Sequence, residues 1–273
     1  MKAQSSFGAY ESDPFVAELY DLNPVYAERT HDIGFYLNFC REANGPVLEL
    51  GCGTGRILLP AAREEVEIVG LDLSAFMLDR CKVKLAKEDP EVRSRVELIH
   101  GTMTDFSVEQ QFALTIIPFR AFQHLVDVAN QISCLRCIAR HLRPGGRLVF
   151  DVFNPDFSKI LAWKHGEEIE NVPDTEIADG RKVRRTHRLV RHSRAGQFNE
   201  VELISYVTEA DGSVKRYVQA FPMRYFSRFE LEHLLARNGF EVETVYGNFD
   251  PAPFEDDSPE MVFVARKEEG PQP

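Results

Sequence analysis

Three glycines at alternate positions follow a short apolar run in the first quarter of the chain. The run Val47–Leu50 leads directly into Gly51, Gly53 and Gly55. A glycine-rich turn after a buried strand lets the backbone approach a ligand closely, and such turns commonly hold the phosphates of a dinucleotide. The dinucleotide fingerprint needs a further glycine where Arg56 stands, so the sequence departs from that pattern at Arg56.

An acidic residue, Asp72, follows the next apolar run, residues 66–71. One carboxylate at this place can accept hydrogen bonds from both hydroxyls of an adenosine ribose. Together, the glycine turn and Asp72 favour an adenosine cofactor lying across the strand ends. They do not require a pyrophosphate.

A histidine, His124, follows a third apolar run, residues 112–119. Ligands of α/β sheets bind at the carboxyl ends of the strands, where His124 is expected. A histidine with an ordinary pKa of about 6.5 can take a proton from an amine or hydroxyl near neutral pH. His124 is therefore a candidate general base, and the alternative is a histidine at a helix start or on the surface.

Strand-length apolar segments alternate with helical segments through the first 153 residues. Strands are expected at 46–50, 66–71, 96–99, 112–119 and 147–153. Helices are expected at 32–41, 56–65, 74–85 and 127–141, with Ser74 as an N-cap and the stretch 144–146 as a stop signal. Nearly continuous apolar strands that alternate with helices predict a parallel sheet covered on both faces.

The pattern changes after Asn154. Residues 182–191, 200–208 and 215–226 are expected to form strands joined by tight turns, which is an antiparallel meander. A helix at 228–238 and strands at 240–246 and 261–265 then resume the earlier alternation. We predict one domain over residues 1–273 with a doubly wound, Rossmann-like sheet of seven mostly parallel strands and helices on both faces. The antiparallel β insertion, residues 160–226, would come after the fifth strand and form a lid over the acceptor site.

The overall charge restricts the kinds of partner. A net charge of −11 and a pI near 5.3 argue against nucleic acid, because phosphate binding needs a basic surface.

The first fifteen residues contain no apolar core typical of a signal peptide, and the longest apolar runs are too short to span a bilayer. Five scattered cysteines indicate a reducing compartment. We expect a cytoplasmic protein with no membrane partner, and a homodimer is possible.

Two of the cysteines, Cys134 and Cys137, form a C-x-x-C pattern that could be redox-active or half of a zinc site. The sequence contains no second such pair, and apolar residues recur around these two with helical spacing. We predict that both pack in the core and that the protein has no metal site.

Basic residues crowd the start of the expected insertion, at Arg181, Lys182, Arg184, Arg185, Arg188, Arg191 and Arg194. Strand alternation would place Arg185, His187 and Arg191 on one face and Arg184, Arg188 and His192 on the other. One face could bind an anionic substrate through arginine. The interpretation we favour is a solvated edge strand that uses charge against aggregation, or a dimer contact.

The stretch LELGCGTG, residues 48–55, resembles class I S-adenosylmethionine-dependent methyltransferases. Asp72 and the stretch LRPGG, residues 142–146, strengthen the resemblance, which covers about residues 15–153 and resumes near 226. It implies S-adenosyl-L-methionine as cofactor and methyl transfer to a nitrogen or oxygen of a small molecule. Three alternatives are an NAD-dependent oxidoreductase, against which Arg56 argues, a non-catalytic S-adenosylmethionine-binding module, and a methyltransferase acting on a protein.

The resemblance also implies the roles of individual residues. Gly51 and Gly53 would approach the methionine moiety, Glu49 would orient the loop or the amino group, and Asp72 would hold the ribose. Where many members have Gly-Asp-Met after the third strand, this chain has Thr102 in place of Asp. The implied cofactor-binding residues are Glu49, Gly51, Cys52, Gly53, Asp72, Leu73, Met77, Thr102, Met103 and Pro118.

Two further stretches, residues 118–125 and 18–21, are similar to bacterial sugar N-methyltransferases that modify deoxyamino sugars. The similarity implies that His124 is the base and that Tyr20 lies near the reacting centre. For Tyr20 the alternative is an aromatic anchor of an N-terminal helix. The stretch NPDF, residues 154–157, resembles a signature of amine-modifying methyltransferases, but it follows the fifth strand instead of the fourth, and we interpret it as a turn.

Overall fold

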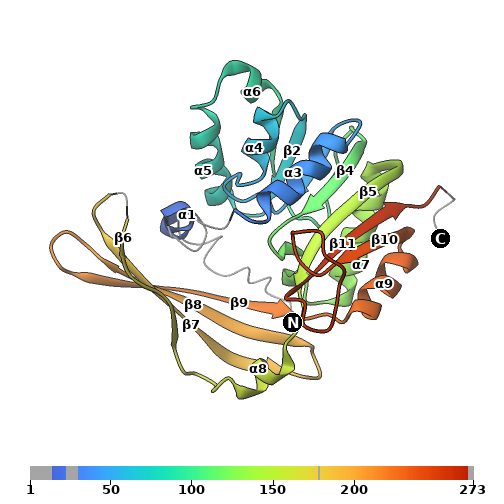
Figure 1. The fold of residues 1–273 in the computed structure, drawn as a ribbon. Helices are drawn as coiled ribbons and strands as arrows, with labels where there is room; N and C mark the ends of the chain where they lie inside the picture. The colour runs from blue at the N-terminus through green and yellow to red at the C-terminus, as the bar shows by residue number, and fades with distance from the viewer. Residues whose placement is uncertain (1–13, 23–29, 178, 270–273) are drawn as a thin grey trace. The chain divides into compact units, whose positions relative to one another are not determined.

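The computed structural model describes residues 14–22, 30–177 and 179–269. The chain divides into two compact units (Figure 1), of which the larger comprises His31–Pro155 and Tyr225–Pro273. The smaller contains Asp156–Arg224 and the described residues before His31. One domain over residues 1–273 with a lid at 160–226 stays a prediction. Most of the stretch in which we saw no signal peptide, residues 1–13, lies outside the described residues.

The larger unit is built on a seven-stranded sheet, whose strands have one predominant direction. Only β11 runs antiparallel to its neighbours, β10 and β5, and the remaining strand pairs are parallel. The doubly wound, mostly parallel α/β sheet expected from the sequence is confirmed. The strand order is β10 (Phe240–Tyr246), β11 (Glu260–Lys267), β5 (Leu142–Phe153), β4 (Phe112–Ile117), β1 (Val47–Leu50), β2 (Ile68–Asp72) and β3 (Val96–His100).

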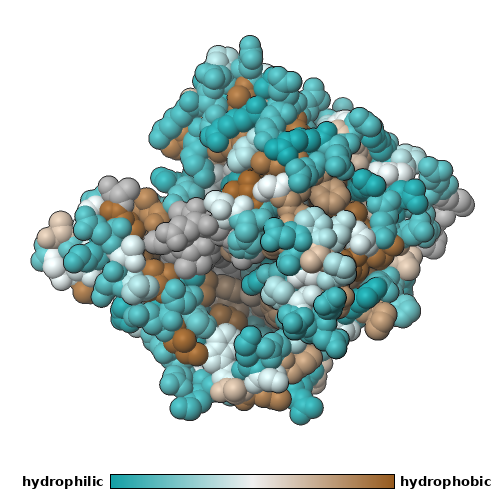
Figure 2. All heavy atoms as spheres, viewed as in Figure 1, coloured by the Kyte–Doolittle hydropathy of each residue, from teal (hydrophilic) through white to brown (hydrophobic). Residues whose placement is uncertain are grey.

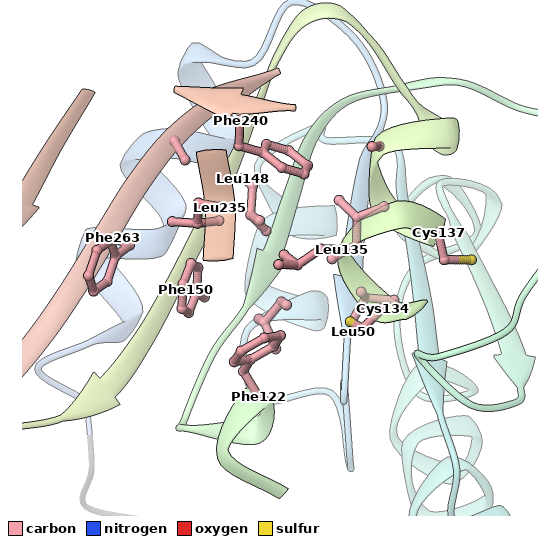
Figure 3. Packing of buried hydrophobic residues seen from close by; sticks show 14 of the residues in the cluster. Leu50, Phe122, Cys134, Leu135, Cys137, Leu148, Phe150, Leu235, Phe240 and Phe263 are labelled. Carbon is pink, nitrogen blue, oxygen red and sulfur yellow. The ribbon is translucent and has the colours of Figure 1, made fainter. Parts of the chain in front are cut away.

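Helices cover both faces of this sheet, as predicted. On one face α7 (Val128–His141) and α9 (Arg228–Arg237) pack against β1, β4 and β5 through residues such as Leu135, Leu235 and Phe150 (Figure 3). Helices α3 (Ile33–Glu42), α4 (Leu58–Arg63), α5 (Ala75–Leu85) and α6 (Pro90–Ser94) contribute to the other hydrophobic cluster. Alternate residues of each strand serve the two faces, which explains the continuous apolar runs.

The predicted end of β4 and the predicted start of β5 were wrong. Strand β4 ends at Ile117, because Phe119 and Arg120 have left-handed backbones, with φ of 59° and 63°. Strand β5 already begins at Leu142, directly after α7, so the stretch 144–146 lies within a strand and does not end the helix. The predicted N-cap is confirmed, since the Ser74 hydroxyl accepts the N–H of Met77 at 3.2 Å.

The smaller unit contains a four-stranded antiparallel sheet in the order β6 (Ile169–Glu176), β7 (Lys182–Ser193), β8 (Phe198–Thr208) and β9 (Val214–Arg224). The meander of the last three strands was predicted, and β6 was missed. Because β6 pairs with β7, the basic strand β7 is an inner strand, and its interpretation as an edge strand was wrong. Residues 154–157, interpreted as a turn, lead into the short helix α8 (Phe157–Ala162), whose first backbone N–H groups Asp156 caps.

Helix α1 (Pro14–Leu22) packs on this sheet within the smaller unit. The ring of Phe15 stacks on Tyr217 at a centroid distance of 4.2 Å. Leu19 joins a small hydrophobic cluster with Val183 and Val207 of the sheet. Tyr20, on the same helix, is half-buried.

A bulge in β7 changes which residues share a face. The register shifts between Leu189 and Arg191, so Arg191 pairs with Glu200 and His192 with Asn199. Arg191 therefore lies on the face of Arg188, whose partner is Glu202, and His192 lies on the face of His187. The simple alternation predicted the opposite faces for Arg191 and His192, because it assumed a regular strand.

Hydrophilic side chains cover most of the surface seen in Figure 2, and hydrophobic side chains are scattered among them. None of the helices in the described part of the chain is long and apolar enough to cross a membrane.

Candidate functional site

The glycine turn lies at the carboxyl end of β1 and is tied to β2. The N–H of Gly51 donates to Leu71 O at 2.7 Å, and the glycines Gly51, Gly53 and Gly55 have φ values of 74°, 56° and 84°. These left-handed conformations favour glycine. A Cβ atom on Gly53 would meet nothing within 4 Å, so the turn leaves open space on this side for a ligand.

The side chain of Cys52 points beneath the turn. A Cβ atom on Gly70 of β2 would lie 2.8 Å from Cys52 Sγ and 2.3 Å from Leu58 Cδ1, so only glycine allows this packing. Cys52 is buried, and burial raises the pKa of its thiol. A contact between Cys52 and a cofactor would therefore involve its backbone.

Asp72 ends β2 beside the turn. Its Oδ2 accepts the N–H of Gly53 at 2.7 Å, and its Oδ1 accepts the N–H of Ser74 at 2.8 Å. Asp72 thus fixes the turn, and its role as acceptor for the ribose hydroxyls stays a prediction.

Glu49 lies on β1 just before the turn and is 2% exposed. Burial raises its pKa to about 8, an effect that the nearby Arg56 partly opposes and Asp72 reinforces. Its Oε2 is buried and has no hydrogen-bond partner among the described residues. A buried carboxyl oxygen of this kind is suited to accept a hydrogen bond from a ligand group.

Arg56, which stands where a dinucleotide fingerprint has glycine, connects three elements. Its guanidinium forms two hydrogen bonds of 2.6 and 2.7 Å with the buried carboxylate of Asp32, next to α3. The same group lies 5.3 Å from the ring centroid of Phe119, at the end of β4. Sequence reasoning missed Asp32, since nothing local distinguishes it from a surface acid.

The chain leaves β4 through a left-handed turn that a buried carboxylate holds. The N–H groups of Phe119 and Arg120 donate to Asp151 of β5 at 2.8 and 3.0 Å, and the phenol of Tyr36 donates to Asp151 at 2.5 Å. Arg120 also forms a paired hydrogen bond with Glu260 of β11. Non-glycine residues in this conformation are strained, and these bonds fix them in it.

His124 is the last residue of the short 3₁₀ helix that follows, η2 (Ala121–His124), and it is half-buried. The backbone on both sides of it is anchored. Gln123 accepts the N–H of Phe153 at 3.0 Å, and Gln131 donates to Leu125 O at 2.7 Å. A Cβ atom on Gly51 would lie 3.0 Å from Ala121 Cβ, so η2 begins beside the glycine turn.

Residues after β2 and β3 lie at the same edge of the sheet. Leu73 O is 2.8 Å from His100 Nε2, and Met77 is buried at the start of α5. The hydroxyl of Thr102 lies 2.8 Å from that of Thr104 and accepts its N–H, so Thr102 is engaged locally. Met103 Cε would be 3.9 Å from a Cβ on Gly51.

The larger unit therefore brings most of the predicted cofactor residues together with His124 at one edge of the sheet. Pro118 lies buried directly after β4. Tyr20 belongs to α1 in the other unit, and its place near the reacting centre stays a prediction.

The C-x-x-C pair belongs to the core. Cys134 and Cys137 are 0% exposed, and Cys137 donates to Phe106 O at 3.2 Å. Burial raises the pKa of both thiols. The packing interpretation is confirmed, and the part of the chain that the structure describes holds no group of three or more metal-ligating side chains.

Comparisons with known proteins find methyltransferases. A family model described as "Methyltransferase domain" matches residues 47–146, which span the glycine turn, Asp72 and His124. The chain is 26% identical over 240 residues to the dTDP-3-amino-3,6-dideoxy-alpha-D-glucopyranose N,N-dimethyltransferase of Streptomyces fradiae, covering 85% of this chain and 86% of that protein. It is 25% identical over 244 residues to the dTDP-3-amino-3,4,6-trideoxy-alpha-D-glucopyranose N,N-dimethyltransferase of Streptomyces venezuelae, covering 87% and 94%.

The fold is also similar to that of a solved methyltransferase from Streptomyces caelestis. The two chains superpose with a TM-score of 0.76 at 25% sequence identity, over 96% of this chain and 98% of the other. The similarity thus extends beyond the residues that the family model matches.

Proposed function

Because the chain is a class I S-adenosylmethionine-dependent methyltransferase, we propose that it methylates the amine of a deoxyamino sugar carried on a nucleoside diphosphate. One observation supports this acceptor most strongly. The two sugar N,N-dimethyltransferases match 85% and 87% of this chain, whereas the general family model matches only residues 47–146. The similarity therefore includes much of the sequence outside the cofactor-binding part.

The residues at the sheet edge fit the cofactor. S-adenosylmethionine supplies a methyl group activated by its bond to a positively charged sulfur. In our proposal the open side of Gly53 accommodates the methionine part, and the buried Oε2 of Glu49 accepts from its ammonium group. The carboxylate of Asp72, at the end of β2 beside the turn, accepts from the ribose hydroxyls. Leu73, Met77 and Met103 would line the adenine side together with Thr102, whose hydroxyl also bonds Thr104.

Two requirements of methyl transfer concern the acceptor nitrogen. It must lie about 3–3.5 Å from the methyl carbon, and it must have a free lone pair. In our proposal His124 accepts the amine's proton, and the anchored backbone of η2 keeps its imidazole in place. Tyr20 would contact the acceptor from α1, and Asp156–Arg224 would act as a lid. Cytoplasmic localisation and a homodimer stay predictions.

The proposal is tested by incubating the purified protein with S-adenosylmethionine and dTDP-3-amino-3,6-dideoxy-α-D-glucopyranose. Mass spectrometry should show one or two added methyl groups on the sugar amine. The matched control is the same sugar nucleotide with its amine acetylated, which should stay unmodified. Methylation of the acetylated control would indicate an oxygen acceptor, and no methylation of either compound would overturn the proposed acceptor.

A further inference from the structure

One face of the four-stranded sheet carries two polar side chains in one row, His187 and Gln219, with Leu203 between them. His187 of β7 is opposite Leu203 of β8, which is opposite Gln219 of β9, so the three side chains project from the same face. Because neighbouring strands lie about 4.8 Å apart, the backbones of His187 and Gln219 are about 10 Å apart. Leu203 fills the middle of the row.

Both polar ends of the row contain a buried nitrogen that lacks a hydrogen-bond partner among the described residues. Gln219 is 8% exposed, and its Nε2 is one of these atoms. The Nδ1 of His187 is the other, although the whole side chain is only half-buried. Buried side-chain nitrogens in native proteins are nearly always hydrogen-bonded, so two on one row indicate that a ligand supplies the partners.

The chemistry of the row fits ligand hydroxyl groups, and the arginine that shares its face, Arg185, donates to Asn171 Oδ1 at 3.2 Å. Arg184, Arg188 and Arg191 project from the opposite face, and glutamates of neighbouring strands pair with them at 3.8, 2.6 and 2.6 Å. Burial and the charge of Arg185 lower the pKa of His187, so its imidazole is neutral near pH 7. A neutral imidazole and an amide bind hydroxyl groups, which donate and accept equally well.

An aromatic ring adjoins the row. Trp163, the one tryptophan of the chain, lies just after α8 and meets His187 edge to face at a centroid distance of 5.1 Å. Trp163 and Leu203 are both half-buried, so the row is not sealed. A sugar ring has hydroxyls at its rim and apolar C–H groups on its faces, and this row offers hydrogen-bonding groups beside apolar and aromatic surface.

We infer that His187 and Gln219 bind ring hydroxyls of the sugar acceptor, with Trp163 and Leu203 packing against its C–H groups. This inference rests on the proposed function and adds to it the part of the acceptor that the four-stranded sheet recognises. His187 and Gln219 would then be specificity-determining residues, and they would take no part in proton transfer.

The test compares two dTDP-linked sugars that differ by one hydroxyl, the 3-amino-3,6-dideoxy sugar and the 3-amino-3,4,6-trideoxy sugar, which lacks the 4-hydroxyl. Their binding is measured by calorimetry in the presence of S-adenosylhomocysteine, which prevents turnover. The variants are Gln219→Leu and His187→Phe, which keep the size of the side chain but remove its buried nitrogen. Thr186→Val is the control, since Thr186 is a buried polar residue of the same strand on the opposite face.

We expect at least one of the two variants to bind the 3,6-dideoxy sugar about tenfold more weakly, the effect of one lost hydrogen bond to a hydroxyl. The same variant should lose less affinity for the 3,4,6-trideoxy sugar. Thr186→Val should bind both sugars as the wild type does. Unchanged affinity in both variants would overturn the inference alone. An equal loss of affinity for both sugars would overturn the assignment of these residues to the 4-hydroxyl. A wild-type protein that binds S-adenosylhomocysteine but neither sugar would overturn the inference together with the proposed acceptor.

Discussion

The phenol of Tyr36 on α3 donates a 2.5 Å hydrogen bond to Oδ1 of Asp151 on β5. Both side chains are fully buried, and burial together with the charge of Asp151 raises the pKa of Tyr36, so the phenol stays protonated and continues to donate. Asp151 in turn accepts the N–H groups of Phe119 and Arg120. One buried carboxylate thus joins α3 to the left-handed turn that precedes His124.

Replacing Tyr36 by phenylalanine should destabilise the protein. The change removes one donor from a buried carboxylate, which should lower the free energy of unfolding by about 1–3 kcal/mol. Urea denaturation followed by circular dichroism measures this effect. Tyr246→Phe is the control, because Tyr246 is only half-buried at the end of β10. Equal stability of the two variants would contradict the importance of the bond to Asp151.

Glu49 should make stability depend on pH. Its pKa rises from an ordinary value of 4.5 in the unfolded chain to about 8 in the fold. Between these values the folded protein holds a proton that the unfolded chain has released, so the Glu49 contribution to stability is complete below pH 4.5 and is lost as the pH rises towards 8. Glu49→Gln has no ionisable group at this position. Its free energy of unfolding should therefore lack the Glu49 slope of about 1 kcal/mol per pH unit in this window.

Denaturation curves recorded from pH 5 to pH 8.5 test the Glu49 prediction. Glu97→Gln is the control, since Glu97 is an exposed carboxylate on β3. Parallel pH profiles for the wild type and Glu49→Gln would show that Glu49 ionises normally.

Asp72→Asn should weaken cofactor binding. The amide nitrogen that replaces one oxygen cannot accept from Gly53, Ser74 or a ribose hydroxyl. We expect the Kd for S-adenosylmethionine and S-adenosylhomocysteine to rise at least tenfold in calorimetric titrations. Asp79→Asn, an exposed residue on α5, should leave both values unchanged. Wild-type affinity in Asp72→Asn would remove Asp72 from the cofactor site.

His124→Ala should lower turnover and leave cofactor affinity intact. A general base contributes about 10²- to 10⁴-fold in rate, and the anchors at Gln123 and Gln131 hold the local backbone without the imidazole. The measurements are methyl transfer to the amino sugar and calorimetric binding of S-adenosylmethionine. His233→Ala on the exposed side of α9 is the control. Undiminished turnover in His124→Ala would exclude it from the mechanism.

Local patterns in the sequence predicted the parts of the fold that depend on neighbouring residues. Continuous apolar runs marked the parallel strands, and Ser74 marked the start of a helix. The glycine turn and Asp72 lie close in sequence, at the ends of two adjacent strands, so their proximity followed from the fold class alone. Strand β6 was missed because its residues are mostly exposed and show no regular alternation.

The amino-acid sequence by itself predicted where the glycine turn and Asp72 lie, because both follow consecutive strands and are encoded locally. Only the tertiary structure decided what surrounds that site. Asp151 lies 115 residues from Tyr36, and Asp32 lies 24 residues from Arg56. No local pattern identifies such pairs, since a carboxylate becomes buried and bonded only when distant elements pack around it. The bulge in β7 likewise places Arg191 and His192 each on the face opposite to the predicted one. Pairing with β8 sets the register, and the periodicity of a single strand does not.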